Sequence, residues 1–173
     1  LMGDYTGAGV IFGVTGGVME AALRSAGYII TGKEFETIEY TAVRGFEGIK
    51  EASVEIDGLT VNVAVAHGMK NAKVLLDPIK NGERKYHFIE IMGCPGGCVN
   101  GGGQPQVHAD IRNFVDIRAE RAKVLYALDK GNAIRKSHEN PAIKETYETF
   151  LGEPGPHLAH KLLHPTYTER KVT

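Results

Sequence analysis

The sequence predicts an α/β fold in which a mixed or parallel sheet is flanked by helices and followed by a helical C-terminal tail. Leucine and valine alternate with other residues in segment 59–66, which is the pattern of a strand with one apolar face. Segment 69–80 repeats its apolar residues at helical spacing, and segment 86–92 returns to a strand-like pattern. Strand, helix and strand in this order are typical of a sheet that contains parallel neighbours.

Length and composition bound the class of protein. The chain has 173 residues, 42% of them hydrophobic and 24% charged, as in globular domains that bury a sizeable core. The 20 lysines and arginines nearly balance the 21 aspartates and glutamates, so we expect neither a nucleic-acid nor an anionic-membrane partner. The chain has no run of about eighteen apolar residues, so no membrane span is predicted. Because no signal peptide is recognisable, we expect a cytoplasmic location.

The N-terminal segment is rich in glycine. We expect residues 1–17 to form a strand or tight passage that turns into a helix, with Thr15 as the N-cap and Gly27 as the stop. Glycines here can serve close packing between a helix and a strand. Their spacing matches neither a dinucleotide-binding loop nor a P-loop, so phosphate binding is not expected.

The middle of the chain is predicted to supply the sheet. We expect a strand at 37–43, a short helical or loop insert at 47–52, and two strands at 52–56 and 59–66 joined by a turn at Asp57–Gly58. A helix should begin after Gly68, and Pro78 should kink or end it.

Segment 86–92 is the strand that leads into the candidate site. Its apolar residues point to both faces, which predicts a central strand covered on both sides. Glu90 is a polar residue within it. Two interpretations stay open: Glu90 anchors nearby backbone or side chains, or it is a partly exposed strand residue.

The C-terminal part is predicted to be helical. Apolar residues keep helical spacing over 107–115, and Asp116 is the expected cap of a helix that runs to Lys130. Asn140–Pro141 is a clear helix start, with the stop at Gly152, and a last short helix should end before Pro165.

Both cysteines of the chain lie in one glycine-rich loop after segment 86–92. Six of the fourteen residues from Met92 to Pro105 are glycine, and Cys94 and Cys98 are separated by three residues. Thiolates that bind iron gain from backbone N–H donors, and glycine brings such donors close without steric bulk. From spacing alone three interpretations stay open: a metal site, a disulfide or inert buried thiols. A further interpretation is that the two thiols bind zinc or another metal at an interface between subunits.

The sequence MGCPGGCVNGGGQP at 92–105 resembles the third active-site signature of the iron-only (FeFe) hydrogenases. Their H-cluster joins a four-iron cubane (a 4Fe-4S cluster) to a two-iron subsite. The resemblance implies that Cys94 and Cys98 ligate the cubane, with Cys98 also bridging to the subsite, and that Met92 lies beside the subsite. The loop backbone would surround the cluster with Gly93, Gly96, Gly97, Gly101, Gly102 and Gly103.

A second stretch agrees with this resemblance. TGAGVIFGVTGGVMEAALR at 6–24 is similar to the family segment between the second and third signatures, in which Phe12 and Gly13 match walls of the two-iron pocket. The first two signatures are missing. They supply two further cubane cysteines, a proton-relaying cysteine and a lysine at the subsite, so no catalytic proton relay is expected in this chain.

The resemblance implies a function that this chain cannot perform alone. It implies one lobe of a hydrogenase that interconverts protons, electrons and dihydrogen. The missing part would come from the remainder of the catalytic domain, in the same longer chain or another one. An electron carrier such as ferredoxin is the expected partner. Iron–sulfur-assembly relatives, sensory relatives and an incomplete, non-catalytic fragment are the alternatives.

The resemblance also suggests a division of the chain. Residues 1–135 would form the C-terminal lobe of the H-cluster domain. Residues 136–173 would form a tail similar to the family's small subunit, fused here and wrapping around the main body because it is too small to fold alone.

Overall fold

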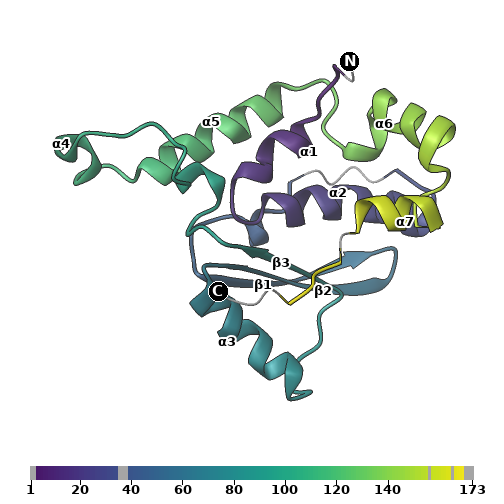
Figure 1. The fold of residues 1–173 in the computed structure, drawn as a ribbon, viewed down its shortest axis with the longest axis horizontal. Coiled ribbons are helices and arrows are strands. Elements are labelled where there is room, and N and C mark those ends of the chain that lie inside the picture. Colours follow the sequence, from purple (N-terminus) through teal and green to yellow (C-terminus); the bar gives the residue numbers. More distant parts are fainter. Residues whose placement is uncertain (1–2, 35–38, 156, 165, 170–173) are drawn as a thin grey trace.

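The computed structural model describes residues 3–34, 39–155, 157–164 and 166–169. Its centre is a three-stranded sheet in the order β1–β2–β3, formed by Ile49–Ile56, Leu59–His67 and Phe88–Met92 (Figure 1). β1 and β2 are antiparallel and joined at Asp57–Gly58, where both residues have positive φ (49° and 82°). β3 follows helix α3, Met69–Lys80, and pairs with β2 in parallel. The predicted mixed sheet flanked by helices is confirmed.

The central strand is β2, which is buried on both faces. Val61, Val63 and Val65 pack against Met19 and Leu23 of helix α2, Gly17–Thr31. Ala64 and Ala66 pack on the other side with Leu75 of α3. Figure 1 shows α2 and α3 on opposite sides of the sheet.

The prediction that segment 86–92 is a covered central strand is wrong for the described residues. β3 begins at Phe88 and is an edge strand with β2 as its only neighbour there. Phe88 is 42% exposed and Ile91 is 41% exposed. The apolar pattern on both faces correctly predicts a strand, but part of the apolar surface of that strand has no cover within the described chain.

Of the strand or tight passage expected at the N-terminus, the described residues form a tight passage, which is helical, and no strand. Helix α1, Gly7–Val10, continues into a 3₁₀ turn at Ile11–Gly13. The N-cap of α2 is Gly16, with φ of 90°, and not Thr15. α2 also passes through Gly27, which is buried inside the helix, and ends at Gly32, with φ of 70°. Burial of that face outweighs the low helix propensity of glycine.

Three further boundaries differ from the predictions. Residues 41–43 form a 3₁₀ turn instead of a strand, and residues 37 and 38 lie outside the described part. Residues 49–51 belong to β1, so the expected insert is shorter. Pro78 lies in the last turn of α3, which runs on to Lys80. A proline so near a helix end removes one donor where few bonds remain to be lost.

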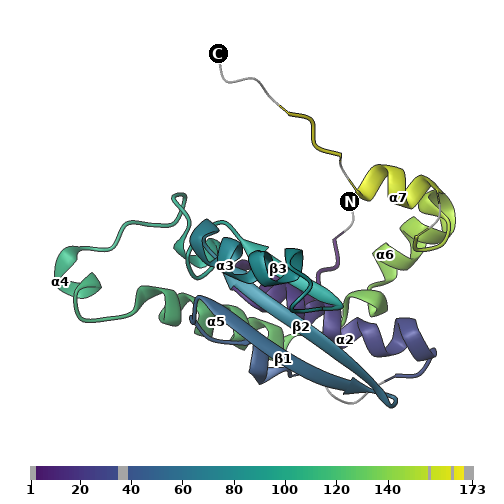
Figure 2. The ribbon, with the colours of Figure 1, turned by 90° about the horizontal axis from the view of Figure 1, so that it is seen from below.

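The C-terminal half follows its predicted caps. Asp116 accepts hydrogen bonds from the backbone N–H groups of Arg118 and Ala119 and begins α5, Ile117–Gly131. Asn140 caps α6, Pro141–Thr146, which continues as a π-helix over Tyr147–Leu151; α7 is His157–Leu163. The helix expected at 107–115 is reduced to α4, Ala109–Arg112. Figure 2 shows α4 extending away from the sheet, at the opposite end from α6 and α7. None of the described helices has the length and apolar content needed to cross a membrane.

Candidate metal centre

The loop that follows β3 presents both thiols. Cys94 and Cys98 are free and exposed, so the disulfide interpretation is not what the structure shows. Gly96 and Gly97 connect them at φ of 87° and 98°, a backbone region that other L-residues rarely adopt. The N–H of Gly97 donates to the carbonyl of Cys94 at 3.0 Å, and the amide of Gln104 donates to the carbonyl of Cys98 at 3.0 Å. The loop is therefore internally braced although its thiols are accessible.

The segment that contains Phe12 and Gly13 packs directly on this loop. The N–H of Thr15 donates to the carbonyl of Gly96 at 3.1 Å. A Cβ on Gly97 would lie 2.7 Å from the carbonyl oxygen of Gly13 and 3.0 Å from Sδ of Met92. Two stretches about 80 residues apart in sequence thus meet at a point where only glycine fits.

Phe12 lies at the edge of this arrangement. Its side chain is 45% exposed and lines an open apolar groove of about 470 Å³ with residues of α2, β2 and β3. The structure therefore brings Gly13, Met92 and Gly97 together, and it places Phe12 at the surface beside them.

The other loop glycines have a different environment. A Cβ on Gly93, Gly102 or Gly103 would meet no described atom within 4 Å, and one on Gly101 would lie 3.2 Å from the carbonyl oxygen of Cys98. Packing within the described chain therefore accounts for glycine at 97 but not at 93, 102 or 103. Two accessible soft thiols beside an open, glycine-rich backbone fit an iron–sulfur group.

Two buried charged residues hold the segment that packs on the loop. Glu90 is 5% exposed and accepts from the N–H groups of Gly16 at 2.6 Å and Met19 at 2.7 Å, so the anchoring interpretation is the one observed. Lys50 is 6% exposed and donates to the carbonyls of Thr15 at 3.3 Å and Gly45 at 2.7 Å. Burial lowers the pKa of Lys50 to about 8, and the nearby carboxylate of Glu90 opposes this shift. Sequence reasoning missed Lys50, because a lysine in a strand is usually exposed.

A buried ion network joins α2 to α5 behind the site. The Arg24 guanidinium contacts Glu20 at 2.8 Å and Asp129 at 2.7 Å, and all three side chains are almost fully buried. Arg44 adds a contact to Glu20 at 2.7 Å, and Arg135 adds one to Asp129 at 2.7 Å. Burial alone would raise the pKa of Asp129, but its hydrogen bonds to Arg24 and Arg135 outweigh burial and lower it. Each buried charge is thus paired.

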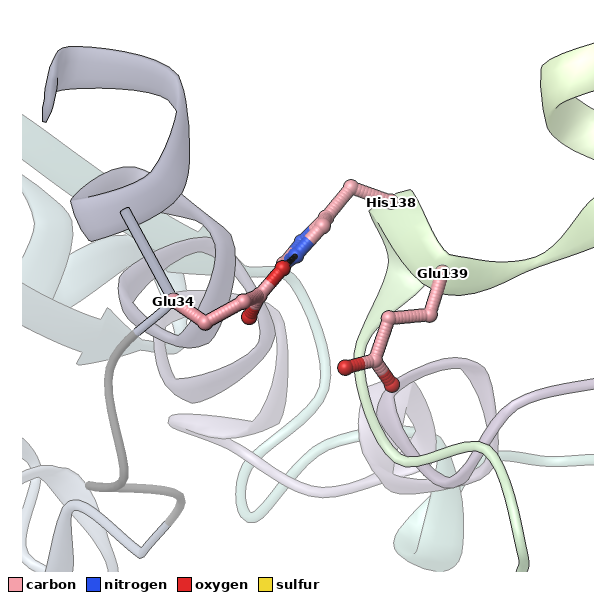
Figure 3. Close-up of side chains that lie close together, drawn as sticks. All are labelled: Glu34, His138 and Glu139. Atoms are coloured by element: carbon pink, nitrogen blue, oxygen red, sulfur yellow. Dashed lines mark hydrogen bonds and ion pairs between the residues drawn. The ribbon is translucent and has the colours of Figure 1, made fainter. Parts of the chain in front are cut away.

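A second group of potential metal ligands lies away from the loop. Glu34, His138 and Glu139 offer ligand atoms within 4.8 Å of one another, and Glu34 and His138 point toward each other (Figure 3). The ammonium of Lys136 lies 2.5 Å from Glu34 and 3.6 Å from Glu139 and supplies the positive charge. The hydrogen bond from Lys136, and to a smaller extent the one from His138, lowers the pKa of Glu34. We interpret this group as an ion-pair cluster that joins the end of α2 to the turn at Ser137–Glu139.

Comparison with known proteins identifies the family to which this chain belongs. The family model described as "Iron only hydrogenase large subunit, C-terminal domain" matches residues 1–102. This chain belongs to the iron-only hydrogenases. A second model of the same group, "Iron hydrogenase small subunit", matches residues 115–170. The relatives named as hydrogenases are oxidoreductases, and the donor set of the loop fits an iron–sulfur cofactor.

The individual relatives are longer than this chain. Iron hydrogenase 1 of Clostridium pasteurianum is 52% identical over 166 residues, which cover 96% of this chain and 29% of the relative. The structure of an FeFe-hydrogenase HydA1 variant from Chlamydomonas reinhardtii matches with a TM-score of 0.67 at 41% identity, over 90% of this chain and 45% of that one. Cytosolic iron-sulfur assembly component 3 of Bos taurus is 32% identical over 156 residues, or 90% of this chain and 31% of the relative. The chain therefore spans less than a third of the length of both of these sequence relatives.

Proposed function

We infer that this chain is one lobe of an iron-only hydrogenase that interconverts two protons and two electrons with dihydrogen. The observation that carries this proposal is the pair of accessible thiols, Cys94 and Cys98, packed through Gly97 against the Phe12–Gly13 segment. The identity of 52% to a named iron hydrogenase supports it.

The proposed cofactor is an H-cluster, a cubane joined to a two-iron subsite, held in part by this chain. Cys94 and Cys98 would supply two of the cubane's four thiolates, and the loop glycines would point backbone N–H groups toward the sulfurs. When bound, the cluster supplies the redox chemistry and the iron position at which hydrogen reacts. Met92, Phe12 and Gly13 would form walls that exclude water from the two-iron subsite.

The remainder of the catalytic domain is the first partner that this function requires. The chain contains only two cysteines, so two cubane thiolates and the proton relay have to come from elsewhere. The exposed apolar side chains of Phe12, Ile29 and Phe88 line one groove and offer a surface that this remainder could cover, as does the edge of β3 that is unpaired within the described residues. An electron carrier such as ferredoxin would deliver electrons to the completed cluster.

A cluster-binding role without hydrogen chemistry is the second candidate. It is favoured by the similarity to an iron–sulfur assembly component, which covers 90% of this chain. Its lower identity, 32% against 52%, favours the hydrogenase.

Replacement of Cys98 tests the proposal. In the assembled protein, Cys98→Ser should lower the iron and sulfide content and abolish hydrogen evolution, because a thiolate ligand is lost. The control is Ser53→Ala, an equally small side-chain change at an exposed position of β1, outside the loop. Full activity of Cys98→Ser would refute the ligand assignment. If the unaltered protein binds an iron–sulfur cluster but evolves no hydrogen, the second candidate is favoured.

A further inference from the structure

Glu90 connects the strand before the cysteine loop to the helix that follows the pocket wall. It lies on β3, four residues before Cys94. Its two carboxylate oxygens accept separately from the N–H groups of Gly16 and Met19, at 2.6 Å and 2.7 Å. The two partners are 74 and 71 positions away in sequence, so the contact fixes tertiary structure.

The carboxylate replaces a local helix cap. The N-cap of α2 is Gly16, which has no side chain to accept the free N–H groups of the first turn. A negative charge at a helix N-terminus is also favoured by the helix dipole. Hydrogen bonds to a charged acceptor are stronger than those between neutral groups, and here both are buried.

Two further contacts hold the same short segment. The N–H of Thr15 donates to the carbonyl of Gly96 in the cysteine loop, and the carbonyl of Thr15 accepts from Nζ of Lys50 on β1. The Thr15–Gly16 peptide and its neighbours are therefore held by β1, by β3 and by the loop. Gly13, two residues earlier, is the residue whose carbonyl leaves no space for a side chain at Gly97.

We propose that Glu90 is a positioning residue of the cluster site. Together with Lys50, it holds the Phe12–Gly13 segment in its position against the Cys94–Cys98 loop. The inference rests on the proposed function, since the wall matters only if the loop carries a cluster. Glu90 touches neither thiol in the described structure; it acts through Gly16, Met19 and Thr15.

Glu90→Gln in the assembled hydrogenase tests this. Glutamine keeps the size of the side chain but turns an NH₂ donor toward one of the two backbone N–H groups. Amide hydrogen exchange, read at single residues, should become about 10- to 100-fold faster at Gly16 or Met19. The midpoint potential of the cluster, followed by electron paramagnetic resonance, should shift beyond the spread of replicates, and hydrogen evolution should fall about 10-fold or more. Glu55→Gln, the same change on an exposed position of β1, is the matched control.

The outcomes separate the positioning role from its alternatives. Unchanged exchange at Gly16 and Met19 would overturn the proposed clamp. Faster exchange with a potential and rate equal to those of Glu55→Gln would reduce Glu90 to a helix cap and overturn the positioning role. The exchange measurement needs no hydrogen turnover, so it can be read even if the proposed function fails. If Glu90→Gln does not fold, Lys50→Met should speed exchange at Thr15 and Gly16, and low protection of Gly16 in the unaltered protein would contradict the clamp.

Discussion

A methyl group added at Gly97 should disrupt the contact between the cysteine loop and the pocket wall. Gly97 has φ of 98°, and its Cβ would lie 2.7 Å from the carbonyl oxygen of Gly13 and 2.8 Å from the nitrogen of Thr15. Both neighbours are backbone atoms, so neither can rotate away. Backbone strain at such a φ costs about 1–3 kcal/mol and overpacking about 1–3 kcal/mol, so Gly97→Ala should destabilise the fold by about 2–6 kcal/mol.

Chemical unfolding followed by circular dichroism measures this loss. Gly131→Ala is the matched control, because Gly131 lies at the end of α5, outside the loop, and its Cβ would meet no described atom within 4 Å. The control should change the free energy of unfolding by less than about 1 kcal/mol, whereas Gly97→Ala should also bind less iron on reconstitution. Equal stability and equal iron content of the two variants would refute the close approach of Gly13 and Gly97.

Three further predictions concern buried and paired charged residues. Lys50 has a folded-state pKa of about 8, below its ordinary value of 10.5, so the unfolded chain binds more protons between these values and stability rises with pH. Between pH 8 and pH 10 the free energy of unfolding, measured in urea, should therefore rise by about 2 kcal/mol. A Lys50→Met variant whose free energy of unfolding rises equally with pH would contradict this. Asp129→Asn leaves the buried Arg24 guanidinium without one of its carboxylates, so thermal and urea unfolding should show a loss of about 3–5 kcal/mol; a loss below about 1 kcal/mol would mean that the pair is not buried in solution. Glu34→Gln removes one of the two carboxylates that pair with the buried Lys136 ammonium; because Glu34 is half-exposed and Glu139 remains, the loss in the same assay should be about 1–2 kcal/mol, and no measurable loss would mean that Lys136 is not buried in solution.

Elements with local signals could be predicted from the sequence. The Asp57–Gly58 turn needs residues that tolerate positive φ, and Asp116 and Asn140 supply their helices with side-chain acceptors within three residues. The cysteine loop was predicted because its motif is contiguous. In each of these cases the deciding interaction lies within a few residues along the chain.

Features that depend on distant contacts could not be predicted in the same way. Gly27 was read as a helix stop, but packing of α2 on the sheet keeps it helical until Gly32. The apolar pattern of β3 correctly indicated a strand, yet its position at the edge depends on which neighbours are present. The sequence left the anchoring role of Glu90 open, because its partners lie more than 70 positions away; the contact of Lys50 with Thr15 spans 35 positions, and no local pattern reveals it.

The most direct measurement is the metal content of the protein isolated from its natural source, combined with native mass spectrometry. We predict that residues 1–173 occur together with further polypeptide, in one chain or in a complex, and that the assembly carries on the order of six iron atoms with inorganic sulfide. An isolated chain that carries zinc, or no metal, at Cys94 and Cys98 would contradict the proposed hydrogenase site.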